Sequence, residues 1–170
     1  SGGRDTKGDD QKVEMGGDVT IADDCNRRDL TMNALFYNIK TKEIVDLVGG
    51  VSDIKNGIVR AVGDASQRFI EDRLRILRVF RFTSRIGGKI DIQTANAIRK
   101  DNRLRGIDEK SNVSQERIWD EMKKAAKQAK NYSEYLEFFN EFDMWDQVFP
   151  GAKINTKIEK TDSFISYIAN

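Results

Sequence analysis

The stretch that decides the fold runs from residue 71 to residue 78 and reads Glu71-Asp72-Arg73-Leu74-Arg75-Ile76-Leu77-Arg78. It lies inside a longer segment, residues 66–86, whose apolar side chains recur with the 3.6-residue period of an α-helix. At about 100° per residue, five polar side chains of this segment fall within an arc of roughly 120°. They are Glu71, Arg75, Arg78, Arg81 and Arg85. The pattern predicts one long helix with a row of guanidinium groups along one face.

Two interpretations of this arginine face are open. It is either a solvated surface, with Glu71 pairing with Arg75 at i,i+4, or a face that meets a ligand. The absence of lysine from the face favours a ligand, because the planar guanidinium fork matches base edges and phosphates. Asp72 and Arg75, one turn apart, offer a hydrogen-bond acceptor beside a donor. Such a pair can read the Watson–Crick edge of a nucleobase.

A second candidate site is Arg27-Arg28-Asp29-Leu30-Thr31-Met32-Asn33-Ala34. Arg28 can neutralise a triphosphate, and Asp29 and Asn33 can reach the hydroxyls of the same ligand. The structural alternative is that Asp29 caps a helix. The near-helical spacing of apolar residues from Leu30 to Phe36 predicts that residues 28–39 form that helix.

Two further segments are compatible with purely structural roles. The segment Asp46-Leu47-Val48-Gly49-Gly50-Val51-Ser52-Asp53 predicts a strand that ends at a glycine pair before a helix. The glycines permit close approach either of a ligand or of another segment. In Ser114-Gln115-Glu116-Arg117-Ile118-Trp119-Asp120-Glu121, Ser114 is a typical helix cap, and Arg117 is expected to pair with Glu121 at i,i+4.

The chain as a whole predicts an α+β fold that is mainly α. Short strands are expected at residues 13–15, 19–21, 43–48 and 58–62, with a mobile loop at the N-terminal end. Beyond residue 64 the helical period takes over, and further helices are expected at 93–100, 114–130, 133–143 and 157–169. At 170 residues the chain has room for one ordinary domain and an appendage.

Composition excludes several classes of protein. There is no histidine and only one cysteine, Cys25, which removes imidazole chemistry, most zinc sites and an intramolecular disulfide. The formal net charge of +1 indicates no partner by itself. No stretch is long and apolar enough to predict a membrane span, so we expect a cytoplasmic protein without a membrane partner.

Together these segments resemble the class II tRNA nucleotidyltransferase (CCA-adding enzyme) and bacterial poly(A) polymerase family. The resemblance rests on RRDLTMNA (27–34), DLVGGVSD (46–53), IVRAVGD (58–64), EDRLRILR (71–78) and SQERIWDE (114–121). It implies nucleotidyl transfer from CTP or ATP to the 3′ hydroxyl of an RNA. The residues that it implies for nucleotide binding are Arg28, Asp29, Asn33, Glu71, Asp72, Arg75 and Arg78. Those implied for RNA binding are Arg81 and Arg85.

The resemblance also divides the chain. Residues 1–63 are expected to be the C-terminal part of a nucleotidyltransferase head, with the last strands of its sheet and a helix over the RRDxTxNA segment. Residues 64–150 would be a helical neck with the base-selecting helix, and residues 151–170 the start of a truncated helical body. The expected partners are ATP, CTP and the 3′ end of a tRNA.

The chain departs from the family at its expected metal site. Members of the family hold Mg²⁺ with an Asp-x-Asp pair, and nothing equivalent precedes Arg27. The adjacent pairs Asp9-Asp10 and Asp23-Asp24 are rejected, because neighbouring side chains diverge on a strand. We therefore expect no catalytic or metal-binding residue in this chain, and no turnover by the chain alone. The catalytic head would come from a missing segment or a separate polypeptide.

Three functions follow as alternatives. The first is the nucleotide-selecting portion of a CCA-adding enzyme. The second is the same portion of a poly(A) polymerase or an A-adding enzyme. The third is a non-catalytic RNA-binding helical domain, in which the arginines grip phosphates without chemistry.

Overall fold

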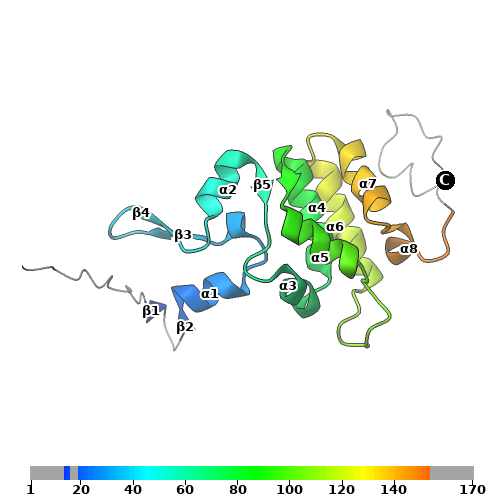
Figure 1. Ribbon diagram of the computed structural model, residues 1–170, viewed down its shortest axis with the longest axis horizontal. Helices are drawn as coiled ribbons and strands as arrows, with labels where there is room; N and C mark the ends of the chain where they lie inside the picture. Colours follow the sequence, from blue (N-terminus) through cyan, green and yellow to red (C-terminus); the bar gives the residue numbers. More distant parts are fainter. Residues whose placement is uncertain (1–13, 16–18, 154–170) are drawn as a thin grey trace, which may run out of the picture.

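The computed structural model describes residues 14–15 and 19–153 (Figure 1). The helix expected at 157–169 and the pair Asp9-Asp10 lie outside the described residues. A smaller, mixed part at one end carries the hairpin and the first two helices, and a helical part forms the other end. The chain is α+β and mainly α, as its sequence predicts. No helix within the described ranges is long and apolar enough to cross a membrane.

The mixed part begins with two short strands and a capped helix. The strands β1 (Glu14–Met15) and β2 (Val19–Thr20) pair antiparallel, as expected, and lead into α1 (Ile21–Arg27). Thr20 and Asp23 form a reciprocal capping box at the start of α1. Asp23 is therefore committed to capping the N-terminus of α1.

The helix predicted over residues 28–39 is wrong, and with it the expected helix over the RRDxTxNA segment. Arg28 is extended, and the chain continues as the short 3₁₀ helix η1 (Thr31–Asn33) and the strand β3 (Leu35–Asn38). The backbone is diverted into tertiary pairing, because Leu30 bridges Ala61 and the Thr31 amide donates to the Arg60 carbonyl at 2.9 Å. Long-range backbone pairing overrides the local helical spacing here.

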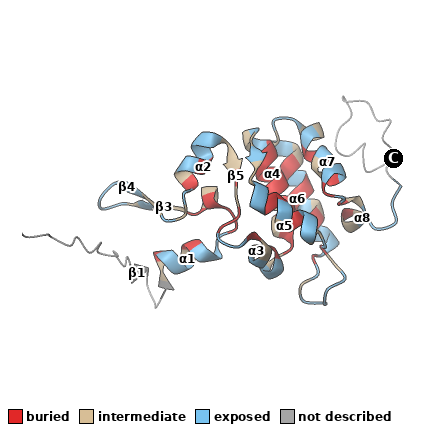
Figure 2. Cartoon of the chain, viewed as in Figure 1, coloured by how far each residue is buried: buried red, intermediate tan, exposed pale blue. Residues whose placement is uncertain are grey.

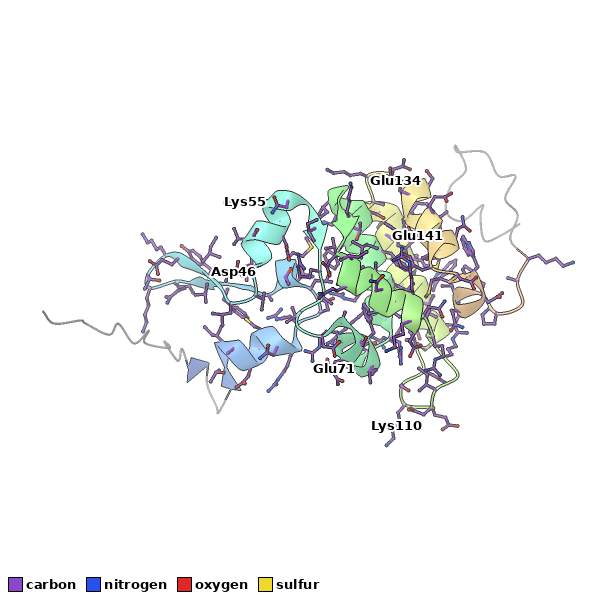
Figure 3. All side chains as sticks on the ribbon, viewed as in Figure 1. Asp46, Lys55, Glu71, Lys110, Glu134 and Glu141 are labelled. Atoms are coloured by element: carbon purple, nitrogen blue, oxygen red, sulfur yellow. The ribbon has the colours of Figure 1, made fainter. Side chains whose placement is uncertain are left out.

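A hairpin and a tight turn follow. Strand β3 pairs antiparallel with β4 (Glu43–Asp46), after which Asp46 accepts hydrogen bonds from the amides of residues 48–51 at the start of α2 (Gly50–Asn56). Figure 3 places Asp46 where the hairpin meets α2. A Cβ atom at Gly50 would lie 2.2 Å from the Thr31 carbonyl oxygen. Gly50 thus permits close approach of another chain segment, η1.

The single helix predicted over residues 66–86 is two helices. Helix α3 (Ala65–Glu71) ends at Asp72, whose extended backbone separates it from α4 (Leu74–Ile86). Asp72 accepts a hydrogen bond from the Leu74 amide at 3.1 Å, and Arg73 is buried beside Asp101 at 3.0 Å. Aspartate competes with the helical backbone in this way, and the long-range ion pair holds the break. Glu71 is consequently on a different helix from Arg75.

The helical part surrounds α4. The parallel pair β5 (Ile58–Val59) and β6 (Lys89–Ile90) joins the two parts, and α5 (Ile92–Lys100), α6 (Gln115–Gln128), α7 (Tyr132–Glu141) and α8 (Trp145–Val148) complete the described chain. Ser114 caps α6 as predicted, and Gly87 ends α4 in the left-handed conformation. Buried residues concentrate on α4 and its neighbours (Figure 2). Phe80 stacks against both Phe138 and Phe142, with centroid distances of 5.3 and 5.2 Å.

Candidate functional site

A cavity of about 770 Å³ lies between α4, α6 and the segment that joins α1 to η1. Most of the residues singled out in the sequence line it, and they come from two separate segments, residues 28–33 and 72–85. They are Arg28, Asp29, Asn33, Asp72, Arg75, Arg78 and Arg85. Glu71 and Arg81 do not line it. The lining carries seven cationic and four acidic side chains, so the cavity attracts anions.

Asp29 is the buried acid of the cavity. Its carboxylate is only 9% exposed and accepts hydrogen bonds from its neighbour's amide, from Asn33 at 3.5 Å and from Arg78 Nε. Burial raises the pKa of Asp29, but the hydrogen bond and charge of Arg78 outweigh this effect and leave the pKa below its ordinary value. Asp29 is therefore a fixed, ionised acceptor, and it links the RRDxTxNA segment to α4 rather than capping a helix.

Asp72 is oriented by a residue of α6. Arg117 donates to both carboxylate oxygens, at 3.3 Å to Oδ1 and 2.8 Å to Oδ2. This hydrogen bonding raises the pKa of Arg117 above its ordinary value. The expected i,i+4 pairing of Arg117 with Glu121 is wrong, because each of these residues is paired across the interface with a different partner on another element. The two-pronged contact holds the Asp72 carboxylate in one plane.

Arg75 is held by three acceptors and retains free donors. Its Nη1 donates to Glu71 Oε2 at 2.7 Å and to the Arg68 carbonyl at 3.2 Å, and its Nη2 donates to the Arg27 carbonyl at 3.1 Å. Among the described residues, its Nε hydrogen and one Nη2 hydrogen have no acceptor. Glu71, labelled on α3 in Figure 3, thus positions Arg75 from outside the cavity.

Arg81 interrupts the predicted row of exposed arginines. Its side chain is 6% exposed, forms an ion pair with Glu121 and donates to Gln128 at 2.9 Å. The expectation that Arg81 lies on a surface open to RNA is therefore corrected by its burial between α4 and α6. Periodicity placed Arg81 on the correct side of the helix, but α6 covers that position.

The sequence reasoning missed two cationic residues of the cavity, Arg117 and Lys124. They lie seven residues apart on α6, which places them on one face of that helix. This spacing is visible in the sequence. However, only the packing of α6 against α4 shows that the face is turned toward Asp72 and Arg85.

The described residues do not fit a metal site. Within residues 14–15 and 19–153 there is no group of three or more cysteine, aspartate or glutamate side chains that could hold a metal ion. Of the rejected pair Asp23-Asp24, the first caps α1 and the second pairs with Arg28 at 3.1 Å.

Comparison with known proteins defines the class. A family model described as the Poly A polymerase head domain matches residues 3–60. A CCA-adding enzyme of Ligilactobacillus salivarius is 48% identical over 85 residues, which are 50% of this chain and 21% of the relative. The chain thus spans about a fifth of the length of that relative.

Solved structures show the same likeness. The Bacillus stearothermophilus CCA-adding enzyme in complex with CTP matches with a TM-score of 0.64 and 34% identity, over 72% of this chain and 29% of that one. The Thermotoga maritima CCA-adding enzyme complexed with tRNA matches with a TM-score of 0.67 and 26% identity, over 81% and 33%. The fold is therefore that of a nucleotidyltransferase. Within that class, the chain is similar in sequence and fold to the class II tRNA nucleotidyltransferase and bacterial poly(A) polymerase family.

Proposed function

We propose that this chain is the nucleotide-selecting portion of a template-independent tRNA nucleotidyltransferase that adds CMP and AMP to the 3′ end of tRNA. The observation that carries the proposal is that Asp72 and Arg75 meet the RRDxTxNA segment in one cationic cavity. The family supplies the reaction class. The relatives solved with CTP and with tRNA support these two partners, and ATP is the second nucleotide of the proposed reaction.

The base would be read by Asp72 and Arg75. An ionised carboxylate offers about four acceptor positions, and Asp72 uses three of them, for Leu74 and for two nitrogens of Arg117. One acceptor remains on Asp72 beside the free donors of Arg75. Cytosine and adenine each present an amino group beside an unprotonated ring nitrogen, which complements this pair. Uracil and guanine present a carbonyl beside a ring N–H, which would leave buried polar groups unpaired.

The sugar and the phosphates would meet the other wall of the cavity. We assign Asp29 and Asn33 to the ribose hydroxyls, and Arg28 and Arg78 to the triphosphate. The support is chemical: Asp29 is an ionised acceptor, and Arg28 is about half exposed, with a surface pairing to Asp24 as its one ion pair among the described residues.

We further propose that the metal-holding carboxylates belong to polypeptide outside the described residues, as a missing segment or a separate chain, and that Mg²⁺ acts only in the complete enzyme. In this scheme residues 1–63 belong to the head, 64–150 to the neck and 151–170 to the start of the body. The hairpin supports this scheme, because Tyr37 and Ile44 lie opposite each other and are 60% and 62% exposed. An apolar surface of this kind is typical of a face that packs against further protein.

The proposal is tested by nucleotide binding to the 170-residue chain. We expect CTP and ATP to bind more tightly than UTP and GTP in isothermal titration, and Asp72→Asn to weaken CTP and ATP binding by about 10- to 100-fold, the usual value of a hydrogen bond to a charged group. Asp120→Asn is the matched control, since Asp120 lines the same cavity but pairs with Lys123 at 3.1 Å. Circular dichroism establishes that both variants are folded. Equal binding of all four nucleotides, or an unaltered preference in Asp72→Asn, would favour the RNA-binding domain instead.

Two further measurements separate the finer alternatives. Incorporation of labelled ATP or CTP into tRNA by the isolated chain would contradict the assignment of the metal site to other polypeptide. The poly(A)-polymerase or A-adding alternative is supported by the family model that matches residues 3–60. Incorporation of CTP against ATP on tRNA that lacks its 3′ end, by the complete enzyme, distinguishes it from CCA addition.

A further inference from the structure

Two cations at the far end of the cavity have no role in nucleotide selection as proposed above. Arg85 on α4 and Lys124 on α6 both line the cavity, and both are exposed. Neither forms an ion pair or a hydrogen bond with another residue in the part of the chain that the structure describes. Most other cations of the cavity, by contrast, have an acidic partner.

The acids nearest in sequence do not neutralise this pair. Glu121 is buried against Arg81, and Asp120, which also lines the cavity, pairs with Lys123 at 3.1 Å. Arg85 and Lys124 therefore leave an uncompensated positive charge at this end of the cavity, open to solvent. A ligand with repeated negative charge is the complement of such a surface.

Distance along α4 separates this end from the base-reading end. Arg75, Arg78, Phe82 and Arg85 line the cavity at steps of three, four and three residues, which places them on one face. Ten residues separate Arg75 from Arg85, equivalent to about 15 Å along a helix. The group that contacts Arg85 is thus different from the base that contacts Arg75.

We propose that Arg85 and Lys124 form a subsite for the phosphodiester backbone of the RNA whose 3′ end is extended. The inference rests on the proposed function and names the part of the site that holds the acceptor rather than the incoming nucleotide. The proposed RNA contacts include Lys124 in place of Arg81, because Arg81 is buried. Lys124 lies on α6, so the sequence pattern of α4 could not indicate it. Each cation neutralises one phosphate and releases its condensed counterions.

The test measures RNA and nucleotide binding separately on the 170-residue chain. The probes are a fluorescent single-stranded RNA ending in cytidine and, in a second arm, CTP. The variants are Arg85→Gln, Lys124→Gln and their combination. The control is Lys127→Gln, which removes one charge from an exposed position of α6 that does not line the cavity. Fluorescence anisotropy at several salt concentrations gives the slope of log affinity against log salt.

We expect each single variant to reduce that slope by about 0.7, and the double variant by about 1.4, as for one and two phosphates of a single strand. The control should bind the RNA as the unaltered chain does, and CTP affinity should stay the same in every variant. An RNA slope in the double variant equal to that of the control overturns the proposal. A parallel loss of CTP affinity also overturns it, and assigns the subsite to the triphosphate.

The test of the phosphate subsite can succeed or fail independently of the test of nucleotide selection. If the unaltered chain shows no preference among nucleotides while the salt slope still depends on Arg85 and Lys124, the phosphate subsite stands and the proposed function fails. If the preference is present and the slope is unaltered, the proposed function stands and the subsite fails.

Discussion

Breaking the buried ion pair between Arg81 and Glu121 should strongly destabilise the protein. Removing both charges together should restore most of the lost stability. The two side chains are 6% and 2% exposed and join α4 to α6, the two helices that carry most of the cavity. We consider Glu121→Gln, which keeps the size of the side chain and leaves the guanidinium of Arg81 charged and buried. Removing one partner of a buried pair costs about 3–5 kcal/mol, because the remaining charge is uncompensated.

This cost is large for a chain of this size. Total unfolding free energies are about 5–15 kcal/mol, so the variant loses a third or more of a typical value. With a urea dependence near 2 kcal/mol per molar, the unfolding midpoint should fall by about 1.5–2.5 M. Arg81→Met combined with Glu121→Leu removes both charges, and should recover to within about 1 kcal/mol of the unaltered chain.

Urea unfolding followed by circular dichroism measures all of these free energies. The control is Glu141→Gln, which breaks the exposed pair of Arg99 and Glu141 between α5 and α7 and should cost no more than about 1 kcal/mol. The reasoning is refuted if Glu121→Gln costs no more than this control. It is also refuted if the double variant is as unstable as Glu121→Gln, because packing rather than unpaired charge would then explain the loss.

Two smaller changes test the connection between the mixed part and the helices. Gly50→Ala should destabilise more than Gly49→Ala in urea unfolding, because its Cβ meets the Thr31 backbone whereas Gly49 has open space and only a positive φ of 81°; equal losses would contradict the close approach. Asp29→Asn should lower stability most at neutral pH. The depressed pKa of Asp29 makes its contribution available above the unfolded value of about 3.9 and lost as pH falls through the folded value. A deficit that stays constant between pH 7 and pH 3 would argue against the ionised pair with Arg78.

Local patterns of the sequence were sufficient for much of the fold. The Ser114 cap and the change to a mainly helical chain near residue 64 both depend on neighbouring residues, and the structure confirms them. The short motifs were also sufficient to name Arg28, Asp29, Asn33, Asp72, Arg75 and Arg78, which the fold brings to one cavity. Their assigned roles stay predictions.

Tertiary contacts determined the structure of the segments for which these local patterns gave a wrong prediction. The segment from Arg28 to Ile39 has helical spacing, but residues 29–31 pair with residues some thirty positions away, and the chain continues as η1 and the strand β3. The helix expected over residues 66–86 breaks because Arg73 is drawn to Asp101, which no periodicity along one element can show.

The pairing of charged side chains was also determined by tertiary contacts. Asp72 is bound by Arg117, 45 residues away, although Arg75 lies one turn along the chain. Glu121 is bound by Arg81, 40 residues away, although Arg117 and Lys124 lie one turn away on α6. Periodicity determines which side of a helix a residue occupies. Which neighbour covers that side, and therefore whether an arginine is buried, paired or free for a ligand, depends on the packing of α6 against α4.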